Sequence, residues 1–186
     1  MKDRIGLAFF TFSAVVSALA AWEHPALLVG LAAFHNGILA ALYAQRKHAL
    51  KYDRPGLWLG LLAAMLPLAT AYPVEMPFPL MITGILGYAM IFWSLLSLGD
   101  RFGIAPADRG LVVRGPYRWV RHPMYLGELV LRAALVAAST QMVLSAGLLI
   151  TLAVIQILRA LREERIIFGY AAYAIQVPYR LVPGVW

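Results

Sequence analysis

The stretch that decides the fold is MPFPLMITGILGYAMIFWSLLSLG, residues 76–99, which contains no Asp, Glu, Lys or Arg. About 20 mainly apolar residues are enough for a helix to cross the hydrocarbon core of a bilayer. Helix is the form open to such a segment, because backbone groups in lipid must be hydrogen-bonded within the segment itself. The stretch therefore predicts a membrane-spanning helix.

Similar runs lie on both sides of this stretch: residues 5–22, 25–45, 55–74, 123–139 and 142–158. The run 123–139 is the weakest candidate, because it contains Glu128 and Arg132. We therefore expect an all-α, polytopic integral membrane protein with five to six transmembrane helices. The last two runs are expected to form a C-terminal helical hairpin.

The composition of the whole chain agrees with lipid as its solvent. Of its 186 residues, 62% are hydrophobic and 13% are charged, and the mean hydropathy is +0.74. An ordinary soluble domain has about 45–50% apolar and about 25% charged residues. The length predicts one domain with no separate soluble module. Cys is absent, which excludes disulfides, thiolate metal sites and a catalytic thiol.

The basic residues are predicted to lie on one face of the membrane. Of the 16 Lys and Arg residues, all but Arg132 fall at the ends of the runs or in alternate connections. The connections on the other face contain Glu23, His24, Glu75 and Gln141, without Lys or Arg. The positive-inside rule then makes both termini and the basic loops cytoplasmic. Lys2 and Arg4 precede the first run as in a signal peptide, but we interpret that run as a retained span.

The net charge of +7 raises the question of an anionic partner. Because the basic residues border apolar runs, we expect contact with anionic lipid headgroups and no nucleic-acid partner. An anionic ligand is the other interpretation that the charge allows.

One basic connection combines residue types that suit a nucleotide-like cofactor. It reads RGLVVRGPYRWVRHPMYLG, residues 109–127, and mixes glycines, aromatic rings, arginines and one histidine. A loop that binds lipid headgroups, with Tyr and Trp at the interface, is the alternative that composition leaves open. Pro123 suits the first turn of a helix. His122 would then lie at a helix N-terminus, where the helix dipole disfavours its protonation.

A second candidate is the sequence RALREER, residues 159–165. Arg159 and Glu163 are four residues apart and so share one face of a helix. A solvated helix end with internal ion pairs is the alternative. The loop and this helix are both predicted to face the cytoplasm, which favours a joint site over two separate surface features.

Polar residues inside the predicted spans form a third group. Glu128 and Arg132 are again four residues apart, and ions in lipid must pair or line a cavity. A structural ion pair and a substrate contact both remain open for them. His35 and Asn36, in the second run, are more typical of a hydrogen bond between helices.

Three motifs together resemble the isoprenylcysteine carboxyl methyltransferase family, which belongs to a wider group with phospholipid N-methyltransferases. They are LVVRGPY at 111–117, RHPMYLG at 121–127 and R-x-x-x-E-E at 159–164. The segments GYAAY at 169–173 and VPYRLVP at 177–183 are similar to the C-terminal part of the family. The resemblance covers about residues 99–186, and the first four runs match only in character.

The resemblance implies S-adenosylmethionine as methyl donor and divides the chain into two parts. Residues 1–99 become a transmembrane scaffold of four helices, and residues 100–186 the catalytic region with a cytoplasmic cofactor-binding loop. The implied cofactor-binding residues are Arg109, Gly110, Leu111, Val112, Tyr117, Arg121, His122, Pro123, Met124, Tyr125, Glu163 and Glu164. The implied catalytic residues are Arg159, which contacts the acceptor, and Glu163. Arg109 stands where eukaryotic members carry His, so the contacts implied there are those of the backbone.

The acceptor follows from the chemistry only as a class. Methyl transfer needs alignment of two reactants more than acid–base help. An isoprenylcysteine-like carboxylate needs no base to accept a methyl group and is the favoured acceptor. A phospholipid amine, which would need a base, remains open. A smaller acid or a thiol also remains open. Other hypotheses are an NADPH-dependent membrane reductase and a non-catalytic membrane protein. The expected partners are a lipophilic or amphipathic substrate and membrane lipids, and the oligomeric state is not predicted.

Overall fold

The computed structural model describes residues 4–66 and 75–186, and this part of the chain is mainly helical. The α-helices are α1 (Arg4–Glu23), α2 (Leu27–Gln45), α3 (Arg54–Met65), α4 (Phe78–Leu98), α5 (Pro123–Ala137), α6 (Met142–Ile166) and α7 (Tyr170–Gln176). The shorter elements are the strands β1 (Lys51–Tyr52) and β2 (Ala107–Asp108) and the 3-10 helices η2 (Gly99–Arg101) and η3 (Gly115–Arg118). The small antiparallel sheet β1–β2 was not part of the all-α prediction.

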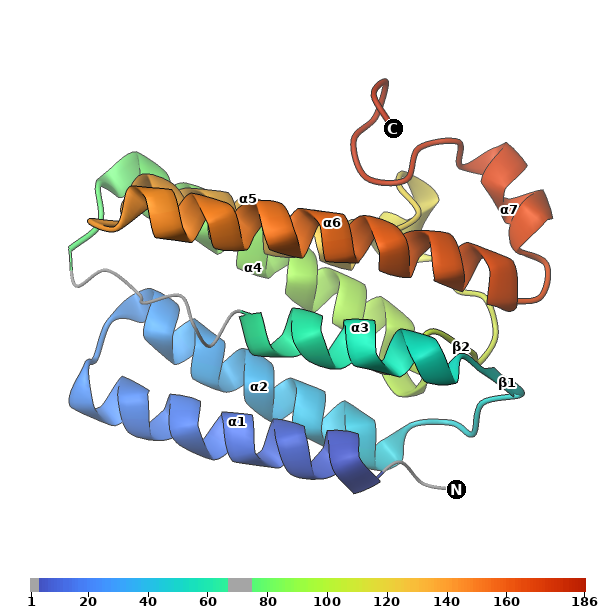
Figure 1. The fold of residues 1–186 in the computed structure, drawn as a ribbon, viewed down its shortest axis with the longest axis horizontal. Helices are drawn as coiled ribbons and strands as arrows, with labels where there is room; N and C mark the ends of the chain where they lie inside the picture. Colours follow the sequence, from blue (N-terminus) through green and yellow to red (C-terminus); the bar gives the residue numbers. More distant parts are fainter. Residues whose placement is uncertain (1–3, 67–74) are drawn as a thin grey trace.

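The helices α1 to α6 lie side by side along the long axis of the molecule (Figure 1). One end of this bundle carries the two strands, α7 and both termini. The opposite end carries the α1–α2 connection and the α5–α6 connection. The loop between α4 and α5, which contains most of the basic connection described above, therefore lies at the end with the strands.

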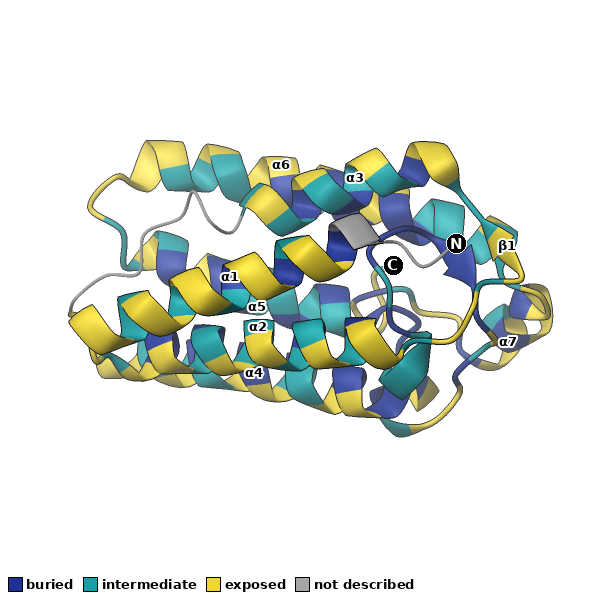
Figure 2. Ribbon diagram, turned by 90° about the horizontal axis from the view of Figure 1, so that it is seen from below, coloured by how far each residue is buried: buried dark blue, intermediate teal, exposed yellow. Residues whose placement is uncertain are grey.

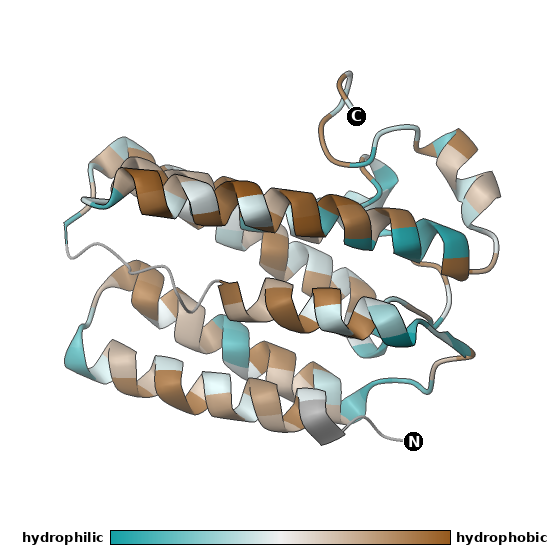
Figure 3. Cartoon of the chain, in the orientation of Figure 1, coloured by the Kyte–Doolittle hydropathy of each residue, from teal (hydrophilic) through white to brown (hydrophobic). Residues whose placement is uncertain are grey.

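Four of the described helices are long and apolar enough to cross a membrane: Gly6–Glu23, Leu27–Gln45, Phe78–Arg101 and Met142–Ile166. Their outward faces are exposed (Figure 2), and the same helices are mainly hydrophobic (Figure 3). Phe12, Leu19 and Ile150, for example, are 64%, 61% and 65% exposed. Such faces suit contact with lipid, and the chain is a multi-pass integral membrane protein.

Two of the six predicted spans are not among these four. The prediction for residues 55–74 is met by α3 as far as Met65, and residues 67–74 lie outside the described part of the chain. The weaker prediction, 123–139, corresponds to α5, whose 15 residues extend for only about 22 Å. A hydrocarbon core is about 30 Å thick. The number of spans beyond four therefore stays a prediction.

Close contact between α4 and α5 positions the start of α5. A Cβ atom added to Gly87 would lie 2.7 Å from the backbone nitrogen of Leu131 and 2.9 Å from the carbonyl oxygen of Gly127. A Cβ atom added to Gly127 would lie 2.8 Å from the carbonyl oxygen of Gly87. Small residues allow two helix backbones to approach in this way in a membrane. The contact fixes α5, and with it the residues at its N-terminus.

Asp53 connects three segments at the end that carries the strands. It follows β1, which pairs with β2 in the α4–α5 loop. Its Oδ1 accepts a hydrogen bond from the backbone N–H of Gly56 at 3.1 Å and so caps α3, and its Oδ2 accepts one from Arg162 Nη1 at 2.8 Å. Burial acts to raise the pKa of Asp53, but the bonds from Arg162 and Gly56 outweigh it, and the pKa is lowered. Asp53 thus joins α3 and the loop to α6.

Candidate active site

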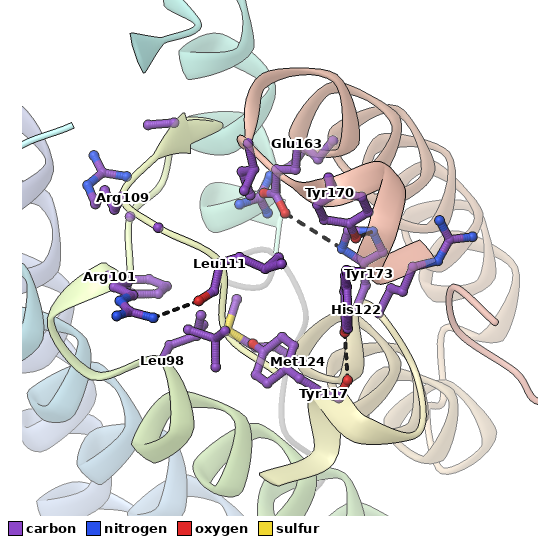
Figure 4. Close-up of a pocket in the computed structure, with 18 of the residues that line it drawn as sticks. Leu98, Arg101, Arg109, Leu111, Tyr117, His122, Met124, Glu163, Tyr170 and Tyr173 are labelled. Carbon is purple, nitrogen blue, oxygen red and sulfur yellow. Dashed lines mark hydrogen bonds and ion pairs between the residues drawn. The ribbon is translucent and has the colours of Figure 1, made fainter. Parts of the chain in front are cut away.

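A pocket lies at this end of the molecule, between the α4–α5 loop, the first turn of α5, the last turns of α6, and α7 (Figure 4). Most of the residues that the resemblance implies line it: Arg109, Gly110, Leu111, Val112, Tyr117, Arg121, His122, Met124, Tyr125, Arg159 and Glu163. Pro123 and Glu164 do not. Pro123 is the buried first residue of α5, and Glu164 contacts His122 from outside the pocket. The fold thus brings together motifs about 40 residues apart in sequence.

His122 connects the loop to α6. Its Nδ1 lies 3.6 Å from Glu163 Oε2, and its Nε2 lies 3.3 Å from Glu164 Oε1 and 3.1 Å from the hydroxyl of Tyr170. Its ring stacks on Tyr125, with ring centroids 5.4 Å apart and planes 2° from parallel. The imidazole is 5% exposed, and both its nitrogens and one face of its ring are in contact with other side chains.

The two carboxylates decide the charge of His122. Burial acts to lower the pKa of this imidazole, but the hydrogen bonds and charges of Glu163 and Glu164 outweigh it, and the pKa is raised. The helix dipole at the start of α5 was expected to disfavour protonation. It is overcome because the carboxylates lie within 3.6 Å of the ring. The two carboxylates therefore stabilise the protonated form of His122.

The adjacent glutamates have different surroundings. Glu163 lines the pocket and accepts a hydrogen bond from the hydroxyl of Tyr125. Glu164 forms a bidentate pair with Arg180, at 2.9 Å and 3.0 Å, and lies 3.2 Å from Arg121 Nη1. Glu164 therefore holds the C-terminal segment against the start of α5, while Glu163 is the carboxylate that faces the pocket.

Arg159 is buried, so the alternative of a solvated helix end does not apply to it. It is 5% exposed, its Nη2 donates to the carbonyl oxygen of Ile104 at 3.1 Å, and its guanidinium carbon lies 4.8 Å from the centre of the Tyr125 ring. Its Nη1 donates to Gln156 Oε1 at 3.0 Å, and Gln156 Nε2 donates to Glu128. Among the described residues, Arg159 Nε has no hydrogen-bond partner.

A second cavity, of about 290 Å³, lies within the helix bundle. Its walls come from α1 to α6 and the loop, and most of its lining is apolar. Phe102, Met124 and Arg159 line both this cavity and the pocket, so the two adjoin at these side chains. Glu128 and Arg132, whose role the sequence left open, both line the cavity.

Three side chains hold the loop, and of these the motifs indicated only Arg109. Asp108 accepts hydrogen bonds from the backbone N–H groups of Gly110 at 3.0 Å and Phe168 at 3.1 Å, and Gly110 has a φ of 91°. Arg101 Nη1 donates to the carbonyl oxygen of Leu111 at 2.7 Å. Arg109 Nε donates to the carbonyl oxygen of Lys47 at 3.3 Å. The side chain of Arg109 thus contacts the segment that follows α2.

Tyrosines form much of the pocket wall. Tyr117, Tyr170 and Tyr173 are labelled in Figure 4, and Tyr125 also lines the pocket. The hydroxyl of Tyr173 donates to the carbonyl oxygen of Tyr117 at 2.6 Å. Burial raises the pKa of Tyr117, Tyr170 and Tyr173, so their hydroxyls stay neutral. Tyr170 and Tyr173 belong to the GYAAY segment, but only their packing on the pocket reveals their place in it.

Part of the chain matches a known protein family. Residues 80–168 match the isoprenylcysteine carboxyl methyltransferase family, and this segment runs from α4 to the end of α6. The match contains the loop, His122, Arg159 and both glutamates. Among curated proteins, no sequence matches the chain. The resemblance predicted from the three motifs is confirmed.

Proposed function

Because residues 80–168 match the isoprenylcysteine carboxyl methyltransferase family, a family of membrane methyltransferases, we propose that this chain transfers a methyl group from S-adenosylmethionine to a lipophilic carboxylate. An isoprenylcysteine-like acid is the favoured acceptor. The observation that carries the proposal is the position of Arg159. This residue lies where the polar pocket adjoins the apolar cavity of the bundle.

The residues of the pocket fit the proposed cofactor. S-adenosylmethionine carries a sulfonium and an ammonium group, and such cations are attracted to aromatic faces and to carboxylates. The tyrosine wall and Glu163 provide both. Residues 110–112 line the pocket and offer backbone groups to a polar ligand, in the manner that the resemblance implies. When bound, the cofactor supplies an electrophilic methyl group.

The chain's own residues then have three tasks. Arg159 is placed to hold the carboxylate of the acceptor, and a guanidinium and a carboxylate can form two parallel hydrogen bonds. His122 fixes Glu163 from one side and Tyr125 by stacking. The apolar lining of the cavity keeps water away from the tail of the acceptor. Alignment of this kind can supply much of the lowering of the barrier in a displacement reaction.

The charges near Arg159 favour a carboxylate over an amine. An amine acceptor would reach the site as an ammonium ion and would need a base to remove its proton. Arg159 would repel this ion, and both ring nitrogens of His122 already face carboxylates, those of Glu163 and Glu164. Glu163 already contacts His122 and the hydroxyl of Tyr125. The family match likewise favours methyl transfer over NADPH-dependent reduction.

Cofactor binding tests the first half of the proposal. Titration calorimetry of the purified chain in lipid nanodiscs is expected to detect S-adenosylmethionine and no competition by NADPH. Tyr125→Ala and His122→Ala remove pocket contacts and are expected to weaken binding at least about tenfold, which corresponds to about 1.4 kcal/mol. Tyr179→Ala and His24→Ala, which change side chains outside the pocket, serve as matched controls. Absence of binding, or equal binding by all variants, would overturn the proposal.

The chemical stability of the product tests the second half. Membranes that contain the chain are incubated with methyl-labelled cofactor, and the labelled lipid fraction is treated with alkali. A carboxyl methyl ester releases labelled methanol under these conditions, whereas an N-methyl lipid keeps its label. Release of the label supports the carboxylate. Retention would assign the chain to amine methylation instead, and Arg159→Ala is the negative control for the carboxyl product.

A further inference from the structure

Helix α3 lies outside the segment that matches the family, but it packs along the part of α6 that carries Arg159 (Figure 1). On one side of Arg159, Ile155 belongs to an apolar cluster with Ala63 of α3. On the other side, Arg162 donates from Nη1 to Oδ2 of Asp53, the residue that caps α3, at 2.8 Å. Arg159 therefore lies between two contacts that hold α6 to α3.

Gly60 brings the backbone of α3 against the α4–α5 loop between these two contacts. Gly60 is buried, and a Cβ atom added to it would lie 2.3 Å from the carbonyl oxygen of Ile104 and 2.9 Å from its carbonyl carbon. Carbon and oxygen atoms that are in contact without a covalent bond are normally about 3.3 Å or more apart. A side chain in place of Gly60 would therefore displace the carbonyl group of Ile104.

The carbonyl group of Ile104 is one of two acceptors that hold the guanidinium of Arg159. Arg159 Nη2 donates to it at 3.1 Å, and Arg159 Nη1 donates to Gln156 Oε1 at 3.0 Å. The N–H groups of a guanidinium point in fixed directions in one plane, so two such bonds set the orientation of that plane. Displacement of the Ile104 carbonyl would therefore turn the guanidinium of Arg159.

The orientation of this guanidinium matters for a carboxylate ligand, because a bidentate pair needs two parallel hydrogen bonds. We propose that Gly60 is a positioning residue for the acceptor, since it lets the carbonyl group of Ile104 orient Arg159 toward the carboxylate. Asp53 supports this arrangement because it holds α3 to α6. The inference rests on the proposed function, which assigns the carboxylate of the acceptor to Arg159.

The alternative is that Gly60 only provides room. Gly60 also lines the cavity within the bundle, so a larger residue would narrow the space for the tail of a ligand. Loss of room would weaken the binding of every ligand with a long tail. A misoriented Arg159 would weaken the binding of ligands that carry a carboxylate. Two ligands with the same tail, one without a carboxylate, therefore separate the two interpretations.

The test compares dodecanoic acid with dodecan-1-ol, which has the same number of carbon atoms and no carboxylate. Binding of each to the full chain in nanodiscs is measured by calorimetry against empty nanodiscs, and S-adenosylmethionine is measured in the same preparation. Gly60→Ala is expected to weaken binding of the acid about tenfold, because hydrogen bonds to a charged group are distorted. Binding of the alcohol and of S-adenosylmethionine is expected to change less than about twofold.

Two variants serve as controls. Gly37→Ala adds the same methyl group in α2, where nothing lies within 4 Å of the added Cβ atom, and is expected to change neither affinity. Ile104→Ala shortens a side chain that lines the cavity but keeps the carbonyl group, so the ratio of the two affinities is expected to stay as in wild type. In that background, Gly60→Ala is still expected to lower the ratio, because the backbone contact remains.

Asp53→Asn gives a second measurement with Gly60 left in place. Asn can still cap α3, but its neutral amide weakens the pair with Arg162. We expect the affinity for the acid to fall about threefold relative to that for the alcohol, as suits a partly exposed ion pair. This variant decides the question if Gly60→Ala does not fold and so does not bind S-adenosylmethionine.

Three results would overturn the inference: an unchanged affinity of Gly60→Ala for the acid, an equal loss of affinity for acid and alcohol, or no binding of the acid by wild type. If the alcohol does not bind to wild type, a lower acid affinity in Gly60→Ala than in Ile104→Ala supports the inference, and equal affinities overturn it. If S-adenosylmethionine binds and labelled membranes yield an alkali-labile methyl ester, the proposed function stands and only the role of Gly60 fails. If wild type does not bind S-adenosylmethionine, the proposed function itself fails.

Discussion

His122 shows how the surroundings of one side chain decide its state. The residue lies at the first turn of α5, and its neighbours Glu163 and Glu164 come from the end of α6. Its pKa is raised above the value of about 6.5 that an unfolded chain would give. A raised folded-state pKa means that the bound proton stabilises the fold. This contribution is fully present below about pH 6.5 and is lost as the pH rises through the folded pKa.

The pH dependence of unfolding tests this statement. Wild-type protein in detergent is expected to lose stability above about pH 6.5 relative to His122→Gln, because the variant has no proton to lose. Each ~1 kcal/mol corresponds to about 2–4 °C in the unfolding temperature of a chain of this size. His24→Gln, at an exposed position between α1 and α2, is the control. Parallel pH profiles for wild type and His122→Gln would contradict the assignment.

Gln156 is a positioning residue for Arg159. It is completely buried and bonds both Arg159 and Glu128. Gln156→Met keeps the volume but leaves Arg159 without one of its acceptors, so the guanidinium is less well placed. We expect KM for the acceptor to rise about tenfold, with a much smaller change in the Kd for the cofactor. Thr151→Val on the same helix is the control, and an unchanged KM would remove Gln156 from the site.

The sequence could indicate only those site residues that carry a motif or a charge pattern. A motif or charge pattern indicated several residues that the structure places around the pocket: Arg121, His122, Met124, Tyr125, Arg159 and Glu163. Gln156 was missed because its signal is a single polar residue in an apolar run. Its importance arises from Glu128, 28 positions away in the sequence. Asp108 was missed for a similar reason, since one of its two backbone partners lies in the turn that precedes α7.

At the scale of elements, the contact between α4 and α5 determines where the pocket is formed. Gly87→Ala or Gly127→Ala would place a methyl group under 3 Å from backbone atoms of the facing helix, so the helices must separate. Such overpacking costs about 1–3 kcal/mol. We expect a lower unfolding temperature in detergent and weaker cofactor binding, because α5 carries His122 and Tyr125.

Gly147→Ala is the matched control for this prediction. Gly147 lies in α6, and nothing is found within 4 Å of the added Cβ atom. Its replacement by Ala favours the helix by about 1 kcal/mol. Equal behaviour of Gly127→Ala and Gly147→Ala would show that the α4–α5 contact is not tight.

The sequence predicted helices better than it predicted spans. Uncharged runs of about 20 residues correspond to α1, α2, α4 and α6. The run 123–139 was weak because of Glu128 and Arg132, and α5 is in fact short. Hydropathy could not reveal that these two side chains face a cavity, because the other walls of the cavity are formed by residues of α1 to α4. The β1–β2 pairing also joins residues more than 50 positions apart, which no local pattern records.

At the scale of the whole molecule, the orientation of the bundle follows from its charges. The end with the strands, α7 and most of the basic side chains is predicted to be cytoplasmic. Because the chain has no Cys, single cysteines can be added at exposed positions without further change. In sealed vesicles of known orientation, we expect Arg118→Cys to react with an impermeant maleimide from the cytoplasmic side only.

The same experiment decides whether α5 crosses the membrane. Glu23→Cys, at the last residue of α1, and Gln141→Cys, in the α5–α6 connection, lie at the opposite end of the bundle (Figure 1). Both are expected to react only from the side opposite to Arg118→Cys. If Gln141→Cys reacted from the same side as Arg118→Cys, α5 and α6 would form a re-entrant hairpin, and the active site would need another orientation.

The pocket and the cavity share part of their wall, so the affinities of the ligands that they bind are expected to be coupled. Phe102, Met124 and Arg159 line both, and the hydrogen bonds of Arg159 run through Gln156 to Glu128. A ligand that reorients Arg159 in one cavity therefore changes the surface offered to a ligand in the other. Linkage requires the effect to be reciprocal: if an acid raises the affinity for the cofactor by some factor, the cofactor raises the affinity for that acid by the same factor.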